Sequence, residues 1–289
     1  MKLFITLLTH HNLPSLKRLV NSVENQYPES YLDVETVIVV NTLSDDYYQS
    51  VLNENFSLRV IRTESNGKCG LGKNSCRDLF LKSDADFLSQ IDGDDIIYPT
   101  FLQSIAQHIK HYPNIDALGI APSELLATYD TGGHSFRCGE NDEFWGCVWG
   151  ISLVKRPDHG PGRGSWIDHP KPEGFDRIIL QSKLSAVIRM DEDITIGDDF
   201  IYSYQLLAEH QKRNLRYFIT MSSDLYVTDR TFTNTIIHEY GHLPYAEEMK
   251  TKAMQHVNIN RSSLEELPVI FNDLLITHQE KAEFLKKIF

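Results

Sequence analysis

The chain has 289 residues, of which 41% are hydrophobic and 24% charged, so it can bury a sizeable core. Its formal net charge of −12, from 28 basic and 40 acidic residues, disfavours a protein that grips nucleic acid through a basic face. The four cysteines lack the density and the paired C-x-x-C spacing of a disulfide framework, which predicts reduced thiols. The apolar start is too short for a signal peptide, and no apolar run is long enough to span a bilayer, so we expect a cytoplasmic protein.

The first half of the chain alternates predicted strands with predicted helices. Apolar and β-branched runs predict strands at Leu3–Leu8, Val34–Val40, Leu58–Arg62, Phe87–Ile91 and Ala117–Ile120. Helices are expected after Asn12, after Ser44, from the glycine-rich segment through Leu81, and after Pro99. This alternation predicts an α/β fold with a doubly wound, mostly parallel sheet flanked by helices.

The second half is less regular. Short strands are expected between Ser123 and Trp149, followed by a long loop at Arg156–Gly174 that is rich in proline and glycine. The remaining pattern predicts a helix at Asp198–His210, strands at Leu215–Thr220 and Leu225–Ile237, and helical structure at Ser263–Ile288.

An acidic cluster, Asp92-Gly93-Asp94-Asp95, follows the strand predicted at Phe87–Ile91. Ligands bind at the carboxyl ends of strands in doubly wound sheets. Carboxylates there can hold a hard divalent cation, which stabilises the charge on a departing diphosphate, and Gly93 lets the backbone approach the phosphates. A solvated acidic turn is the alternative, since Asp-Gly pairs are common turn formers.

Four segments together resemble one family. The acidic cluster is followed by a helix-opening Pro99, the first strand runs Ile5-Thr-Leu-Leu-Thr-His, a glycine-rich segment spans Asn66 to Asn74, and Gly197-Asp-Asp-Phe opens a later helix. In this order, over roughly residues 1–210, the chain resembles family 2 of the GT-A glycosyltransferases. The resemblance implies a GT-A fold and metal-dependent transfer of a sugar from a nucleotide-sugar donor to an acceptor hydroxyl, with inversion.

The resemblance also implies roles for individual residues. Asp94 and Asp92 would bind Mn²⁺ or Mg²⁺, with Asp95 in support, and Asp92 would also contact the ribose. Asp199, beside Asp198, would deprotonate the acceptor. Neighbouring helix residues project about 100° apart, so we expect only one acid of this pair to face the sugar. The implied donor-binding residues are Thr6, Leu8, Thr9, Asn41, Asn66, Lys73, Asn74, Asp92 and Gly93.

The sequence departs from the family after the second strand. Family members usually carry an aspartate there, which accepts the N3–H of uracil, whereas this chain has Asn41 or Thr42. An asparagine accepts through its carbonyl oxygen or donates through its amide. A UDP-sugar is therefore the first expectation, and the identity of the base stays open.

A competing motif is His238-Glu-Tyr-Gly-His242, which matches the H-E-x-x-H of zinc metalloproteases. On a helix, His238 and His242 would bind zinc and Glu239 would act as the base. The preceding β-branched run predicts a strand, and Pro244 opposes a continuing helix. In a transferase, His238 would complete the metal site, with His242 as the reserve.

The acceptor is the least defined partner. Trp149 and Trp166 are candidates to stack on a sugar ring or a base, with core packing as the alternative. Glycans or lipid-linked sugars are the expected acceptors, and a hydroxymethylated base in phage DNA is a less favoured one. We expect a catalytic domain over 1–245, with a nucleotide-binding half at 1–120 and an acceptor-binding half at 121–245. A C-terminal helical extension would cover 246–289.

Overall fold

The structure is a computed structural model, and it describes residues 1–120, 123–127, 135–138, 144–149, 177–193, 198–220, 225–229, 269–270 and 275–289. Eight strands form the larger sheet, in the order β13-β11-β6-β10-β4-β1-β2-β3. Within the described residues, β10 runs antiparallel to both its neighbours and the other pairs of this sheet are parallel, which confirms a mostly parallel sheet. The strands are β1 (Lys2–Thr9), β2 (Asp33–Val40), β3 (Arg59–Arg62), β4 (Phe87–Asp92), β6 (Ala117–Ile120), β10 (Arg177–Ser182), β11 (Tyr217–Thr220) and β13 (Val269–Ile270).

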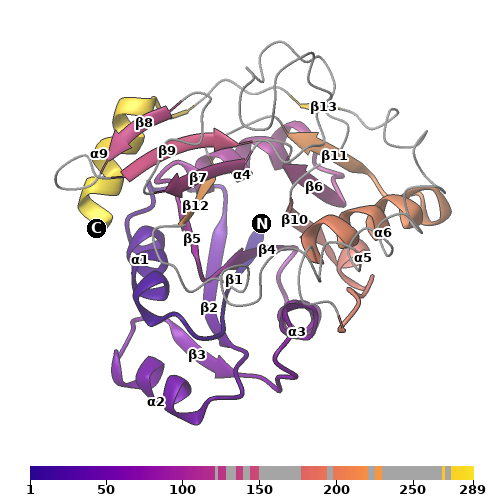
Figure 1. The fold of residues 1–289 in the computed structure, drawn as a ribbon. Helices are drawn as coiled ribbons and strands as arrows, with labels where there is room; N and C mark the ends of the chain where they lie inside the picture. The colour runs from indigo at the N-terminus through magenta and orange to yellow at the C-terminus, as the bar shows by residue number, and fades with distance from the viewer. Residues whose placement is uncertain are drawn as a thin grey trace, which may run out of the picture.

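Helices cover both faces of this sheet (Figure 1). Alternate residues of β1 face opposite sides of it, so the sheet has two apolar layers. Leu3, Ile5 and Leu7 pack with α1 (Leu13–Glu24) and α4 (Phe101–His111). Phe4 points the other way and packs with α3 (Cys69–Lys82) and α5 (Lys183–Ala186). The long helix α6 (Asp198–Arg213) covers β10 and β11. The face that carries α3 and α6 also carries the acidic residues discussed below.

The helix starts expected from the sequence are present. The side chain of Asn12 accepts a hydrogen bond from the backbone N–H of Ser15, and a proline lies in the first turn of α1. Ser44 caps α2 (Asp45–Asn53) in the same way, through the N–H of Tyr47. These caps satisfy backbone groups that a helix leaves unpaired at its start, so local sequence fixes where both helices begin.

A second sheet of five strands lies beside the first, in the order β5-β12-β7-β9-β8. Its strands are β5 (Asp95–Ile97), β12 (Tyr226–Asp229), β7 (Ser123–Ala127), β9 (Phe144–Trp149) and β8 (Ser135–Cys138). The short strands expected between Ser123 and Trp149 are confirmed. The sequence did not predict β5, a three-residue strand that pairs antiparallel with β12 directly after the acidic turn.

The C-terminal part differs from the sequence expectation in one respect. Val269–Ile270 form the edge strand β13, parallel to β11, where helical structure was predicted. This pairing joins segments about fifty residues apart in the chain, so no local pattern marks it.

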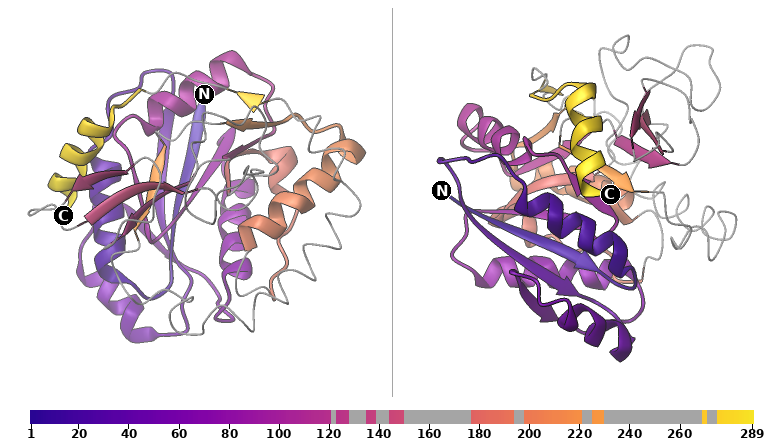
Figure 2. Two further views of the ribbon diagram at one scale, coloured as in Figure 1. Left: turned by 45° about the horizontal axis from the view of Figure 1, so that its top comes forward. Right: turned by 90° about the vertical axis from the view of Figure 1, so that its left-hand side faces the viewer.

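Helix α9 (His278–Ile288) begins with a capping box formed by Thr277 and Glu280. It lies beside α1 and β8 (Figure 2). Its Phe284, Leu285 and Ile288 share a buried cluster with residues of β5 and β12. The boundary expected at residue 245 falls outside the described residues. None of the described helices is long and apolar enough to cross a bilayer.

Candidate active site

A tight turn joins β4 to β5 and carries the four residues of the acidic cluster. A Cβ atom on Gly93 would lie 2.8 Å from the carbonyl oxygen of Leu8, so glycine lets this turn pack against the end of β1. Strand β12 holds the turn from the other side. The N–H of Asp229 donates to the carbonyl of Asp94 at 2.7 Å, and the hydroxyl of Thr228 donates to Asp95 Oδ1 at 2.8 Å.

Asp95 is completely buried within this turn. Its Oδ2 contacts the guanidinium of Arg177 and accepts the backbone N–H of Asp92 at 3.2 Å. Burial raises the pKa of Asp95 to about 7, against the lowering effect of Arg177, while the charges of Asp94 and Asp92 raise it further. An inward carboxylate with these partners holds the turn together, and its supporting part in metal binding stays a prediction.

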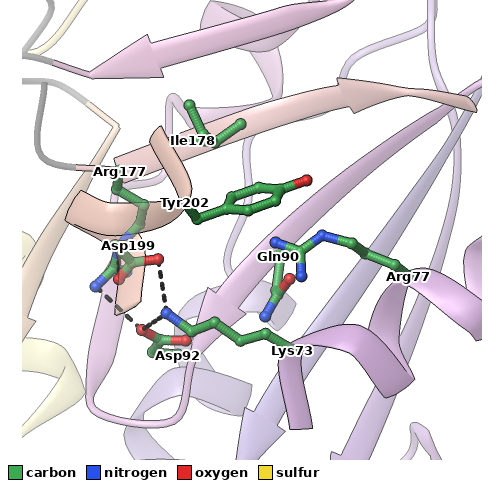
Figure 3. A pocket seen from close by; sticks show the side chains of 8 residues that line it. All are labelled: Lys73, Arg77, Gln90, Asp92, Arg177, Ile178, Asp199 and Tyr202. Carbon is green, nitrogen blue, oxygen red and sulfur yellow. Dashed lines mark hydrogen bonds and ion pairs between the residues drawn. The ribbon is translucent and has the colours of Figure 1, made fainter. Parts of the chain in front are cut away.

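Lys73 reaches from α3 into the centre of the acidic group (Figure 3). Its Nζ lies 3.2 Å from Asp92 Oδ2, 2.7 Å from Asp198 Oδ2 and 2.7 Å from Asp199 Oδ1. Burial lowers the pKa of this lysine, but the three carboxylates hold it well above its ordinary value of 10.5. Lys73 is therefore charged at neutral pH.

The expectation that only one acid of the Asp198–Asp199 pair faces the sugar stays a prediction. Both carboxylates contact the same ammonium group, since Lys73 ends between the first two residues of α6. They still differ, because Asp199 lines the cavity and its side chain is 26% exposed, against 14% for Asp198.

Arg177 is a site residue that is absent from the set expected from the sequence. Because β10 is antiparallel to β4, its first residue lies near the edge where β4 ends. The guanidinium lies 3.2 Å from Asp92 Oδ2 and 3.7 Å from Asp199 Oδ2, in addition to its contact with Asp95. The available signal was an arginine directly before the apolar run Ile178-Ile-Leu, three residues after the loop expected at Arg156–Gly174.

The charges of the site do not balance. Four carboxylates, those of Asp92, Asp95, Asp198 and Asp199, share two cations, Lys73 and Arg177. Burial raises the pKa of Asp199 to about 6, and the nearby Lys73 counteracts that rise. A carboxylate with this pKa is largely ionised at neutral pH and can accept a proton.

The donor set fits a hard divalent cation. Asp92 and Asp94 offer carboxylate oxygens from one turn, the ligand type that Mg²⁺ and Mn²⁺ prefer. Within the described part of the chain, no group of three or more His, Cys, Asp or Glu side chains is arranged to hold a metal by itself. A magnesium-type ion commonly takes one or two carboxylates and completes its shell with substrate phosphates and water, so two suffice.

A cavity opens behind these charges (Figure 3). Gln90 points into it from β4, two residues before Asp92 and on the same face of the strand. This side chain is 8% exposed, and its Nε2 has no hydrogen-bond partner among the described residues. A buried amide donor without a partner is costly, so a substrate oxygen or water in the cavity would satisfy it. The lining residues are Lys73, Arg77, Gln90, Asp92, Arg177, Ile178, Asp199 and Tyr202.

Asn41 is buried at the end of β2, beside α3. Its amide donates to Thr63 Oγ1 at 3.0 Å and to the carbonyl of Glu64 at 2.5 Å, which uses both of its N–H groups. A Cβ atom on Gly72 would lie 3.0 Å from the Asn41 side chain, so the glycine permits this close packing. What Asn41 can still offer a nucleobase is its carbonyl oxygen.

The other residues expected to bind the donor do not line the cavity. Thr6 is completely buried, and the hydroxyl of Thr9 hydrogen-bonds that of Tyr47. Leu8 is half-buried beside Gly93. Asn66 is exposed and donates to the carbonyl of Glu192, whereas Asn74 is buried and bonds the backbone of Met190.

Some expected site residues lie outside the described part of the structure. These are Trp166, His238, Glu239 and His242. Trp149 belongs to β9, although its side chain is not described. The third metal ligand and the acceptor-stacking residues therefore stay predictions.

A family model described as glycosyl transferase family 2 matches residues 5–180 of the chain. No functionally curated protein matches it. Among solved structures, S. aureus TarS residues 1–349 in complex with UDP-GlcNAc align with a TM-score of 0.53 and 16% identity, over 90% of this chain and 67% of that one. GalNAc-T7 with UDP, GalNAc and Mn²⁺ also gives 0.53, at 14% identity, over 91% of this chain and 50% of that one.

The length of the chain differs from that of its structural neighbours. A longer S. aureus TarS structure aligns with a TM-score of 0.51 and 17% identity over 90% of this chain, which spans 40% of the length of that one. Likeness at this level of identity shows the fold, and it confirms the GT-A arrangement expected from the sequence.

Proposed function

Because the chain belongs to glycosyl transferase family 2, we propose that it transfers a sugar from a nucleotide-sugar donor to an acceptor hydroxyl, with a divalent cation and with inversion. One observation carries this proposal. Lys73 gathers Asp92, from the acidic turn, and the Asp198–Asp199 pair, from the start of α6, around a single ammonium group. A candidate metal ligand and a candidate base thus lie close together at one site, which suits the attack of an acceptor hydroxyl on a bound donor.

A UDP-sugar is the proposed donor. The TarS structure contains UDP-GlcNAc and the GalNAc-T7 structure contains UDP, GalNAc and Mn²⁺. In this chain the N–H groups of Asn41 are committed within the protein, which leaves an acceptor oxygen. An acceptor matches the N3–H of uracil and disfavours a base edge that presents only acceptors.

The site supports a division of labour in the transfer step. When bound by Asp92 and Asp94, Mn²⁺ or Mg²⁺ would supply Lewis-acid stabilisation of the diphosphate charge. Asp199 takes the proton from the acceptor hydroxyl while that oxygen bonds to the anomeric carbon and the bond from this carbon to the diphosphate oxygen breaks. Attack from the face opposite the diphosphate inverts the configuration. Lys73, next to both groups, attracts the diphosphate and lowers the pKa of the base.

Gln90 is proposed to bind the transferred sugar. Its unpartnered amide points into the cavity beside Lys73 and Asp92. A sugar hydroxyl or acetamido oxygen there would satisfy the buried donor. For the acceptor, a glycan or lipid-linked sugar is proposed. The net charge of −12 disfavours DNA carrying a hydroxymethylated base.

Calorimetry with UDP tests the metal-dependent donor site. We expect UDP to bind in the presence of Mn²⁺. In EDTA its affinity should be lower by roughly tenfold or more, because the excess acidic charge repels the diphosphate. Asp94→Asn should remove most of the Mn²⁺ effect, and Asp46→Asn, an exposed acid of α2, serves as the control. Equal affinity with Mn²⁺ and with EDTA would refute the metal bridge. Absence of binding by any nucleotide or nucleotide sugar in a thermal-shift panel would refute the donor site itself.

A further inference from the structure

Four buried polar side chains, two of which line the cavity, form a connected network, and the proposed transfer step does not use their hydrogen bonds. They come from α3, β10 and α6, and each is at most 2% exposed. Buried polar groups of this kind are costly unless they are paired, and a fully paired network fixes the arrangement of the elements it joins. The residues are Asn74, Arg77, Gln181 and Tyr202.

At one end of the network, Asn74 pairs with the backbone of Met190. The Asn74 amide donates to the Met190 carbonyl at 2.9 Å, and the Met190 N–H donates back to Asn74 Oδ1 at 3.0 Å. Asn74 also donates to Glu192 Oε1 at 2.9 Å and accepts from Arg77 Nη1 at 3.1 Å. Both N–H groups and both lone pairs of the Asn74 side chain are therefore used within the protein.

At the other end, Tyr202 pairs with the backbone of Ile188. Arg77 Nε donates to Gln181 Oε1 at 3.3 Å, and its guanidinium lies 4.0 Å above the centre of the Tyr202 ring. Gln181 Nε2 donates to the Tyr202 hydroxyl at 2.8 Å, which donates in turn to the Ile188 carbonyl at 3.0 Å. Both ends of the network thus bond to the same backbone segment, Ile188 to Met190. The network therefore holds α3 against α6.

The two helices locked in this way carry the two central groups of the site. Lys73 directly precedes Asn74 on α3. Asp199 precedes Tyr202 by three residues on α6, which places both on one side of the helix. The separation of 2.7 Å between Lys73 Nζ and Asp199 Oδ1 therefore depends on how α3 and α6 are held.

We propose that Asn74 and Tyr202 are positioning residues, which hold the base Asp199 on α6 at its working distance from Lys73 on α3. This proposal rests on the proposed function, in which Asp199 is the base. It gives Asn74 a role different from the donor contact implied by the family resemblance, since no atom of its carboxamide is left for a ligand.

Loss of the Tyr202 hydroxyl should act on the base and not on donor binding. Tyr202→Phe keeps the ring beneath Arg77 but leaves Gln181 Nε2 and the Ile188 carbonyl without their partner. The charge of Lys73 lowers the pKa of Asp199. Without the network, α6 should move away from α3, and Asp199 would then feel this charge less. The pKa of the base should then rise, and a misplaced base transfers the proton less efficiently.

The experiment compares Tyr202→Phe with Ser89→Ala. The control removes a buried hydroxyl whose 2.8 Å bond to the Ile179 carbonyl joins β4 to β10 outside the network. For Tyr202→Phe we expect UDP affinity within about twofold, kcat lower by roughly 10- to 100-fold, and an acidic limb of the pH profile moved to higher pH. Ser89→Ala should keep kcat and the pH profile. Gln181→Glu, which keeps the acceptor for Arg77 and loses the donor to Tyr202, replaces Tyr202→Phe if that variant fails to fold.

Hydrogen exchange of residues 198–213 gives a readout that needs no turnover. Faster exchange there in Tyr202→Phe than in Ser89→Ala supports the network, even if the wild-type protein transfers no sugar and the proposed function falls. Unchanged exchange overturns the positioning role. An unchanged kcat and pH profile in Tyr202→Phe also overturns it, as does an equal loss of kcat in Tyr202→Phe and Ser89→Ala.

Discussion

Lys73 shows how one side chain organises several others. Without it, Asp92, Asp198 and Asp199 would place three negative charges within a few ångströms in a buried site, and at least one would take up a proton at neutral pH. Burial has the largest influence on Asp199 and raises its pKa. With Lys73 beside it, the pKa is held at about 6. The lysine therefore sets the protonation state of the candidate base.

Asp199→Asn should leave UDP and metal binding intact and reduce transfer by roughly 10²- to 10⁴-fold, the usual worth of a positioned base. Asparagine keeps the shape of the side chain but cannot take the proton. In the wild type, kcat/KM should rise with pH through about 6 and level off above it, because only the ionised carboxylate acts as a base. Steady-state kinetics and calorimetry provide the measurements. Asp198→Asn is the matched control and should cost less, so near wild-type transfer by Asp199→Asn would refute the assignment.

Lys73→Met tests the electrostatic influence of the lysine on the base. Because the charge of Lys73 lowers the pKa of Asp199, its removal should move the acidic limb of kcat/KM to a pH above about 6. Donor affinity should fall as well, since the ammonium also attracts the diphosphate. Lys73→Arg retains a cation and should shift the limb less. An acidic limb that stays at the same pH in Lys73→Met would show that the base is not coupled to this lysine.

At the scale of elements, glycines set how closely α3 approaches its neighbours. A Cβ atom on Gly70 would overlap the carbonyl oxygen of Asp191, and one on Gly72 would press on Asn41. The first turn of α3 therefore rests on the segment before α6 and on the end of β2. This contact places the start of the helix, and hence Lys73 in its second turn, within reach of the acids.

Gly70→Ala should destabilise the fold and displace Lys73. Overpacking of this kind typically costs about 1–3 kcal/mol, and here the obstacle is backbone, which moves less readily than a side chain. We expect a lower midpoint in urea unfolding and weaker UDP binding in the same variant. Ser75→Ala, on the same helix, removes a hydroxyl and adds no atoms, so it should change both properties little. Wild-type stability and affinity in Gly70→Ala would show that α3 does not depend on this contact.

At the scale of the whole molecule, the C-terminal helix belongs to the same packed body as the acidic turn. Leu285 of α9 is completely buried in a cluster with Ile96 of β5 and Val227 of β12. Ile96 directly follows Asp95, and Val227 directly precedes Thr228 and Asp229, which hold the turn. The stability of the turn is therefore tied to the docking of α9.

Leu285→Ala should lower the free energy of unfolding by about 2–5 kcal/mol, the usual cost of emptying a buried leucine site. Because α9 shares a buried cluster with β5 and β12, we expect one cooperative transition at a lower denaturant concentration. Lys287→Ala, on the exposed side of the same helix, should change stability by less than about 0.5 kcal/mol. A separate early transition of α9, with the remaining transition unchanged, would mean that α9 docks as an independent extension. Circular dichroism and fluorescence, followed in urea, distinguish the two outcomes.

The sequence by itself determined the alternation of strands and helices through β6 apart from β5, the helix starts at Asn12 and Ser44, and the position of the acidic turn at the end of β4. These features depend on residues within a few positions of one another, through strand and helix periodicity and through capping. The family resemblance also rested on local segments in a fixed order. The match of the family model to residues 5–180 confirms it.

Only the tertiary structure decided which polar groups meet. The antiparallel direction of β10 brings Arg177 to Asp92, 85 residues earlier in the chain, and the packing of α3 brings Asn74 to Met190, 116 residues later. The same packing places Asp198 and Asp199 together on Lys73 and turns the Asn41 amide inward. The free energy of such contacts depends on burial and on partners distant in sequence. A local sequence pattern can therefore indicate a candidate site residue, but it cannot predict which residues that side chain contacts.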